Sequence, residues 1–130
     1  MAHPIGYHTS YNPQALTPGI LDRIQQEWGS QLEHMTYEQK IVMRAALSGY
    51  IAEKPVWKTE GSGITCIDAC IESAGVDWDI WDKDEFLVEV IQQCSLLSEG
   101  DIEGLIAALT EQIRDRVYAS RIEEWVVVTP

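Results

Sequence analysis

The sequence has few basic residues and no long apolar run, and both shortages exclude classes of function. Nine lysines and arginines stand against 21 acids among 130 residues, which gives a formal net charge of −12. A protein that tracks nucleic-acid phosphates or an anionic membrane surface needs a basic face, so neither kind of partner is expected. No apolar stretch approaches the roughly 20 residues that span a bilayer. The first residues lack the features of a secretory signal, so we expect a cytoplasmic protein.

Cysteine is also scarce, which excludes a disulfide-stapled scaffold. There are three cysteines, an odd number without framework spacing, as is usual in the cytoplasm. A chain of this length can bury about two-thirds of its unfolded surface and needs no cross-link or metal to fold. We predict a single domain over residues 1–130, with an irregular arm over 1–16 and a short extended tail over 120–130.

Apolar residues recur at helical spacing in five segments, which predicts an all-α fold, a compact bundle of about five helices. The first helix is expected after Thr17 and Pro18, a favourable N-cap and a favourable first helical residue. The second is expected over residues 37–53, because Thr36 and Gln39 form the pattern of a capping box.

Three further helices follow at short intervals. Pro55 ends the second helix, and the third is expected over residues 64–75, closed by Gly75. The fourth begins within the acidic stretch described below, and the fifth follows the letters SEGD. No catalytic constellation is found along these helices.

The cysteines and histidines are the first candidates for chemistry. Cys66 and Cys70 are four apart and flank the apolar arc of their helix, so we interpret them as small core residues. The alternative hypothesis is a redox or metal-dependent sensor, or a small enzyme, that uses both cysteines, with His34 as a further candidate. His3 and His8 lie in the arm without the further converging ligands that a metal site needs, so no metal site and no cofactor are predicted.

The middle third of the chain carries nearly all of the excess negative charge. Residues 60–103 contain twelve acids and one base, Lys83. Residues 1–59 contain five acids and five bases, and residues 104–130 contain four acids and three bases. The densest part is DWDIWDKDEF, residues 77–86, with two tryptophans and four aspartates. A cationic partner would be steered towards this field.

The aspartates of this stretch do not form a calcium loop of the EF type. Counted from Asp77, position 5 is Trp81, position 6 is Asp82 instead of glycine, and position 12 is Val88 instead of glutamate. A looser divalent-cation site is left as an alternative.

Helix capping explains the second half of the stretch. Asp82 and Glu85 form the pattern of a capping box, and Trp81 and Phe86 have the spacing of a hydrophobic staple. Asp84 would then lie in the first helical turn, where the helix dipole favours acids.

Capping leaves Asp77, Trp78 and Asp79 unexplained. Trp78 either fills the core or stands exposed in an acidic rim, as aromatic anchors do at interfaces. The second interpretation predicts a protein-interaction domain, a regulator, adaptor or inhibitor that binds a basic surface of a partner protein. Another hypothesis is a small apolar ligand held between the helices. The predicted partner-binding residues are Asp77, Trp78, Asp79, Asp84, Glu99, Asp101 and Glu103.

Overall fold

The computed structural model describes residues 3–9, 19–56, 66–75 and 84–119, and these residues confirm the predicted all-α fold. Five α-helices of nine or more residues lie within these ranges, and no strand is found there. The elements are α1 (Ile5–His8), α2 (Ile20–Trp28), α3 (Tyr37–Glu53), the 3₁₀ turn η1 (Lys54–Val56), α4 (Cys66–Gly75), α6 (Glu85–Cys94) and α7 (Glu99–Arg114).

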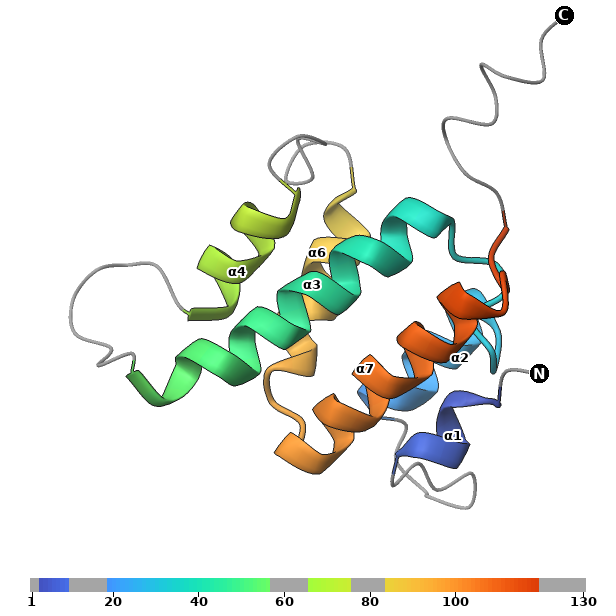
Figure 1. Cartoon of the computed structure of the whole chain (residues 1–130), viewed down its shortest axis with the longest axis horizontal. Helices are drawn as coiled ribbons and strands as arrows, with labels where there is room; N and C mark the ends of the chain where they lie inside the picture. Colours follow the sequence, from blue (N-terminus) through green and yellow to red (C-terminus); the bar gives the residue numbers. More distant parts are fainter. Residues whose placement is uncertain (1–2, 10–18, 57–65, 76–83, 120–130) are drawn as a thin grey trace, which may run out of the picture.

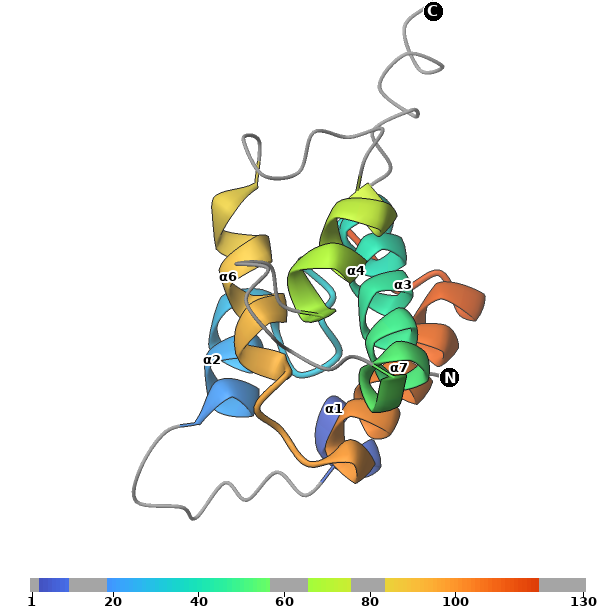
Figure 2. The same ribbon diagram turned by 90° about the vertical axis from the view of Figure 1, so that its left-hand side faces the viewer.

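Helix α3 lies at the centre of the bundle, and α4, α6 and α7 all pack against it (Figure 1). Figure 2 shows α2 and α6 on one side of the molecule and α3 and α7 on the other. Among the described residues, no helix has both the length and the apolar character to cross a membrane. The core between the helices includes the fully buried side chains of Ile24, Leu32, Met43, Leu47, Ile71, Leu87, Ile91, Ile102, Leu105 and Leu109.

The predicted capping box starts α3 as expected. The Thr36 hydroxyl accepts a hydrogen bond from the Gln39 N–H at 3.1 Å, and the Gln39 side chain accepts one from the Thr36 N–H at 2.9 Å. The helix ends at Glu53, as predicted, and Pro55 lies in the 3₁₀ turn that follows.

Helix α6 begins later than the sequence pattern predicts. Its N-cap is Asp84, whose Oδ1 accepts a hydrogen bond from the Leu87 N–H at 3.2 Å. Glu85 is therefore the first residue of this helix and not its third. The predicted cap Asp82 and the staple residue Trp81 lie outside the described residues.

Helix α2 also has a different cap from the predicted one. Gly19 stands at the N-cap and provides no side-chain hydrogen bond, whereas Thr17 and Pro18 lie outside the described residues. The apolar face of the helix is as expected, since Leu21, Ile24 and Trp28 are all buried.

The predicted N-terminal arm contains one helical turn, α1, which the proline- and glycine-punctuated sequence did not indicate. Ile5 is completely buried, and its N–H donates to the Ser30 carbonyl at 2.8 Å. Helix α1 packs on α7, where the backbone passes directly over Gly104. A Cβ at Gly104 would lie 2.0 Å from the His8 carbonyl oxygen, so only glycine permits this approach.

The far end of α7 is closed by a Schellman motif that has arginine in place of glycine. Arg116 adopts a positive φ of 61°. The Val117 N–H donates to the Gln112 carbonyl at 2.8 Å, and the Arg116 N–H donates to the Ile113 carbonyl at 3.2 Å. These two bonds are the pair that defines the motif, and its left-handed residue is usually glycine.

Candidate functional site

The structure does not bring the predicted partner-binding residues together in one cluster. Asp77, Trp78 and Asp79 lie outside the described residues. Asp84 lies at the start of α6, whereas α7 starts beyond the other end of that helix (Figure 1). A ten-residue helix is about 15 Å long, and this length of α6 lies between Asp84 and the turn that leads to the other described residues. Those others are Glu99, Asp101 and Glu103.

Asp84 is occupied by structural contacts. One carboxylate oxygen caps α6, and the other accepts a hydrogen bond from the Gln39 side-chain amide at 2.9 Å. The residue therefore links the start of α6 to the start of α3. At the start of α7, the Ser98 hydroxyl performs the capping and accepts a hydrogen bond from the Asp101 N–H at 3.2 Å.

Three helices of the acidic segment each carry two acids spaced four residues apart. Acids with this spacing lie on the same face of a helix, and like charges placed so destabilise an isolated helix by about 0.2–0.5 kcal/mol per pair. No lysine or arginine occurs within residues 66–75 or 84–103. The three acidic pairs are Asp68 with Glu72 on α4, Glu85 with Glu89 on α6, and Glu99 with Glu103 on α7.

Bases from the neutral first part of the chain reach two of these acids. Arg23 Nη2 lies 3.2 Å from Glu89 Oε1, and Lys54 Nζ lies 3.7 Å from Glu99 Oε1. All four side chains are at least partly exposed, and exposed ion pairs contribute less than about 1 kcal/mol. These two ion pairs therefore offset only a small part of the negative charge on these helices, and Asp68 also accepts a hydrogen bond from the Gln92 side-chain amide at 2.8 Å.

An exposed leucine lies in the turn between two of the acidic helices. Leu96 is 86% exposed and is the most exposed large apolar side chain among the described residues. It lies between the end of α6 and Glu99, the first residue of α7. A single exposed leucine is common on protein surfaces, but this one has the position of an apolar anchor beside acidic charge.

The two cysteines of α4 are buried, as their interpretation as core residues requires. Burial raises the pKa of the Cys70 thiol to about 12 and also raises the pKa of the Cys66 thiol. Cys70 Sγ lies 3.4 Å from Glu53 Oε2, and this acceptor raises the pKa further. Reactive and metal-binding cysteines need a lowered pKa, so nothing in this geometry favours the sensor hypothesis. His34, its third predicted residue, is exposed in the turn before α3.

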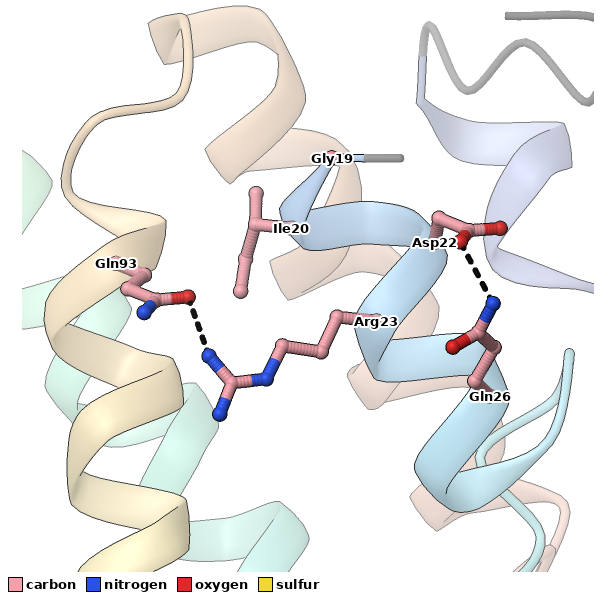
Figure 3. A pocket seen from close by; sticks show the side chains of 6 residues that line it. All are labelled: Gly19, Ile20, Asp22, Arg23, Gln26 and Gln93. Atoms are coloured by element: carbon pink, nitrogen blue, oxygen red, sulfur yellow. Dashed lines mark hydrogen bonds between the residues drawn. The ribbon is translucent and has the colours of Figure 1, made fainter. Parts of the chain in front are cut away.

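An open cleft of about 360 Å³ lies between α2 and α6 (Figure 3). Arg23 crosses it and donates to Gln93 Oε1 at 2.9 Å, while its guanidinium lies 5.0 Å from the centre of the Phe86 ring. On the other wall, Gln26 donates to Asp22 at 2.9 Å. These polar groups already have partners within the protein, so the cleft offers no converging set of groups to a ligand.

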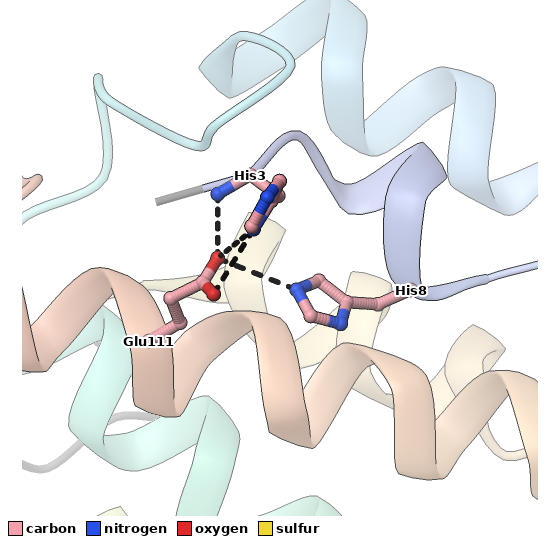
Figure 4. A group of neighbouring side chains, drawn as sticks. All are labelled: His3, His8 and Glu111. Atoms are coloured by element: carbon pink, nitrogen blue, oxygen red, sulfur yellow. Dashed lines mark hydrogen bonds and ion pairs between the residues drawn. The ribbon is translucent and has the colours of Figure 1, made fainter. Parts of the chain in front are cut away.

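Two histidines and a glutamate converge where α1 lies on α7 (Figure 4). His3 Nδ1 lies 3.1 Å from Glu111 Oε2 and 3.2 Å from Oε1. His8 Nε2 lies 3.4 Å from Oε1 of the same carboxylate. The three ligand atoms lie within 4.8 Å of one another, and we call this group the His₂–Glu cluster.

Hydrogen bonding holds the carboxylate of the cluster in its ionised form. The backbone N–H of His3 also donates to Glu111, and this bond is the largest cause that lowers the pKa of Glu111 to about 2. The two histidine side chains lower it further. Arg114 is the nearest competing cation, with Nη2 at 4.0 Å from Glu111 Oε2, although its Nε donates to Asp115 at 3.1 Å.

The sequence did not predict this cluster. His3 and His8 were considered as metal ligands and no site was predicted, because nothing in the sequence connects them with Glu111, more than 100 residues away. Only the packing of α1 on α7 brings them together.

Comparisons with known proteins give no relative from which a role could be transferred. No family model, no curated protein sequence and no solved structure matches this chain.

Proposed function

We propose that this chain is an acidic protein-interaction domain, a regulator, adaptor or inhibitor that acts in the cytoplasm. Its partner is a protein with a basic surface. The observation that carries the proposal is the presence of three acidic i,i+4 pairs, on α4, on α6 and at the start of α7, with no lysine or arginine within residues 66–75 or 84–103.

The energetics of these pairs favour a binding role over a purely solvating one. A surface that intersperses both signs of charge is solvated without repulsion along a helix, so single-sign pairs are not needed for solvation alone. The helix dipole offsets the repulsion for Glu85 and Glu99, which lie in first turns. Glu72 and Glu103 lie beyond the first turns of their helices and have no such compensation. A cationic partner would relieve this repulsion.

The partner would be attracted by charge and held by apolar contact. Complementary charge raises the rate of association and selects the partner, whereas buried apolar anchors supply most of the affinity. Leu96 is the described residue with the exposure and position for that role. The predicted anchor Trp78, with Asp77 and Asp79, stays a prediction.

The test compares two triple variants with the same change in net charge. The first, Glu72→Gln, Glu85→Gln and Glu103→Gln, removes one exposed acid from each acidic pair. The control changes three exposed glutamates outside the pairs to glutamine, namely Glu27, Glu33 and Glu53.

Both variants and the wild type are used to capture partners from a lysate at low and high salt. A carbodiimide then couples carboxylates directly to partner lysines. We expect a salt-sensitive conjugate with the wild type and the control variant, joined at one of the three glutamates, and its loss in the first variant. Equal capture by the two variants, or the absence of any salt-sensitive conjugate, would refute the proposal.

A further inference from the structure

The His₂–Glu cluster is built by two elements that are held in fixed positions. Helix α1 is anchored by buried Ile5 and by the close passage of its backbone over Gly104. Glu111 follows Gly104 by seven residues, which is two helical turns, so both lie on the same face of α7. The contact that requires glycine therefore also sets the carboxylate opposite the two imidazoles (Figure 4).

The separations within the cluster match those between ligands of one metal ion. Zinc binds histidine nitrogen and carboxylate oxygen at about 2.0–2.2 Å, so neighbouring ligand atoms of a tetrahedral site lie about 3.3 Å apart. Measured to the same carboxylate oxygen, Glu111 Oε1, the nitrogen-to-oxygen separations in the cluster are 3.2 Å for His3 Nδ1 and 3.4 Å for His8 Nε2. The third edge, between the two ring nitrogens, is no longer than 4.8 Å.

We propose that His3, His8 and Glu111 bind a divalent first-row transition metal ion, with Zn²⁺ as the expected occupant. Two imidazoles and one carboxylate are a donor set found in zinc sites that keep a further coordination position for water or another ligand. The site is accessible from solvent on one side, since the His3 side chain is 46% exposed while those of His8 and Glu111 are 16% and 15% exposed.

Bound metal would join the start of the chain to its last described helix. His3 and His8 flank and end α1, and Glu111 lies in the last turns of α7. The ion would replace the present hydrogen bonds between the imidazoles and the carboxylate and would hold α1 in place. Arg114 would have to stay with Asp115, 3.1 Å away, because its charge opposes that of the ion.

The test measures Zn²⁺ binding to the full chain, purified without a histidine tag, by competition with a chromophoric chelator. We expect one ion per chain in the wild type. His8→Gln and Glu111→Gln should each weaken binding by more than the roughly 10- to 100-fold that is typical when a hydrogen-bonding partner of a metal ligand is removed. His34→Gln is the matched control, because it removes the histidine outside the cluster and should leave the affinity unchanged.

Two further measurements keep the assignment falsifiable. Zn²⁺ should raise the melting temperature of the wild type and of His34→Gln, but not that of His8→Gln, and circular dichroism of the metal-free variants shows that they are folded. Co²⁺ should give the visible bands of a site with nitrogen and oxygen ligands. A sulfur-to-cobalt charge-transfer band would place the ion on cysteine and overturn the assignment. Equal affinity in all variants, or no binding by the wild type, would show that the cluster is only hydrogen-bonded.

Discussion

Replacing Lys40 by methionine tests how a buried ammonium group is accommodated in this core. Lys40 of α3 is completely buried, although lysine is almost always found on the surface of a protein. Its Nζ donates to Gln112 Oε1 at 3.0 Å, to the Gln31 carbonyl at 3.4 Å and to the Val117 carbonyl. The side chain thus connects the turn before α3 with the closing turn of α7.

Burial disfavours the charged form of this lysine and lowers its pKa from 10.5 to about 8, against the opposing attraction of Glu33. One pKa unit corresponds to about 1.4 kcal/mol, so keeping Lys40 protonated costs the folded state about 3 kcal/mol relative to the unfolded chain. Between pH 8 and 10.5 the unfolded chain holds this proton and the folded protein does not. The contribution of Lys40 to the unfolding free energy therefore rises with pH across this window.

The cysteines act in the opposite direction and must be separated from this effect. Burial raises the pKa of Cys70 and of Cys94 to about 12, against 9.0 for an ordinary thiol. Their contribution to stability is fully present below pH 9 and is lost as the pH rises towards 12. Because Lys40→Met retains the cysteines, their effect cancels in the difference between wild type and variant.

The assay is urea unfolding of wild type and Lys40→Met at pH 7 and at pH 10.5. At pH 7 the substitution removes the cost of burying a charge, which stabilises the variant. It also leaves the acceptors of Nζ unpaired, which costs about 1–3 kcal/mol each. The unfolding free energy at pH 7 should therefore change little or fall. From pH 7 to pH 10.5 the wild type should gain about 3 kcal/mol over the variant. Lys54→Met is the control, because the Lys54 side chain is 32% exposed and its substitution also removes one positive charge. Parallel pH profiles for wild type and Lys40→Met would refute the reasoning.

Three further changes test the packing and the turns. Gly104→Ala should displace α1, because the new Cβ would lie 2.0 Å from the His8 carbonyl oxygen, and faster amide exchange in α1 would report this. Arg116→Gly should raise the unfolding free energy by about 0.5–1 kcal/mol, measured in urea, because glycine adopts the left-handed conformation without strain. Thr36→Ala should lower it by about 1 kcal/mol, since it removes the side-chain cap of α3, and an unchanged midpoint would contradict the assigned cap.

The helices whose ends are set by local contacts were predictable from the sequence. Residues 37–53 form α3 as predicted, because Thr36 and Gln39 satisfy each other's backbone groups. The start of α6 was not predictable in the same way. Asp82 and Asp84 are both suitable caps by type, and the hydrogen bond from the Gln39 side chain on α3 favours Asp84. A tertiary contact of this kind leaves no periodic signal in the sequence.

Polar residues in the core and the His₂–Glu cluster were missed for related reasons. Lys40 and Gln112 look like surface residues in any helical pattern, but they are buried as a pair 3.0 Å apart. The turn at Arg116 lacks the glycine that usually marks a Schellman motif. Glu111 joins His3 only through a contact across 108 positions of the chain.

The packing of α1 against α7 has a consequence for the order in which the protein folds. Helix α1 is made before all the helices described above, yet α7, against which it packs, is made last among them and ends at Arg114. During synthesis, α2, α3, α4 and α6 can associate while the α7 surface that receives α1 does not yet exist. Closing a segment of about 100 residues also costs more entropy than forming the shorter contacts within the bundle. We therefore expect α1 to dock last, after the helices that follow it in the sequence have associated.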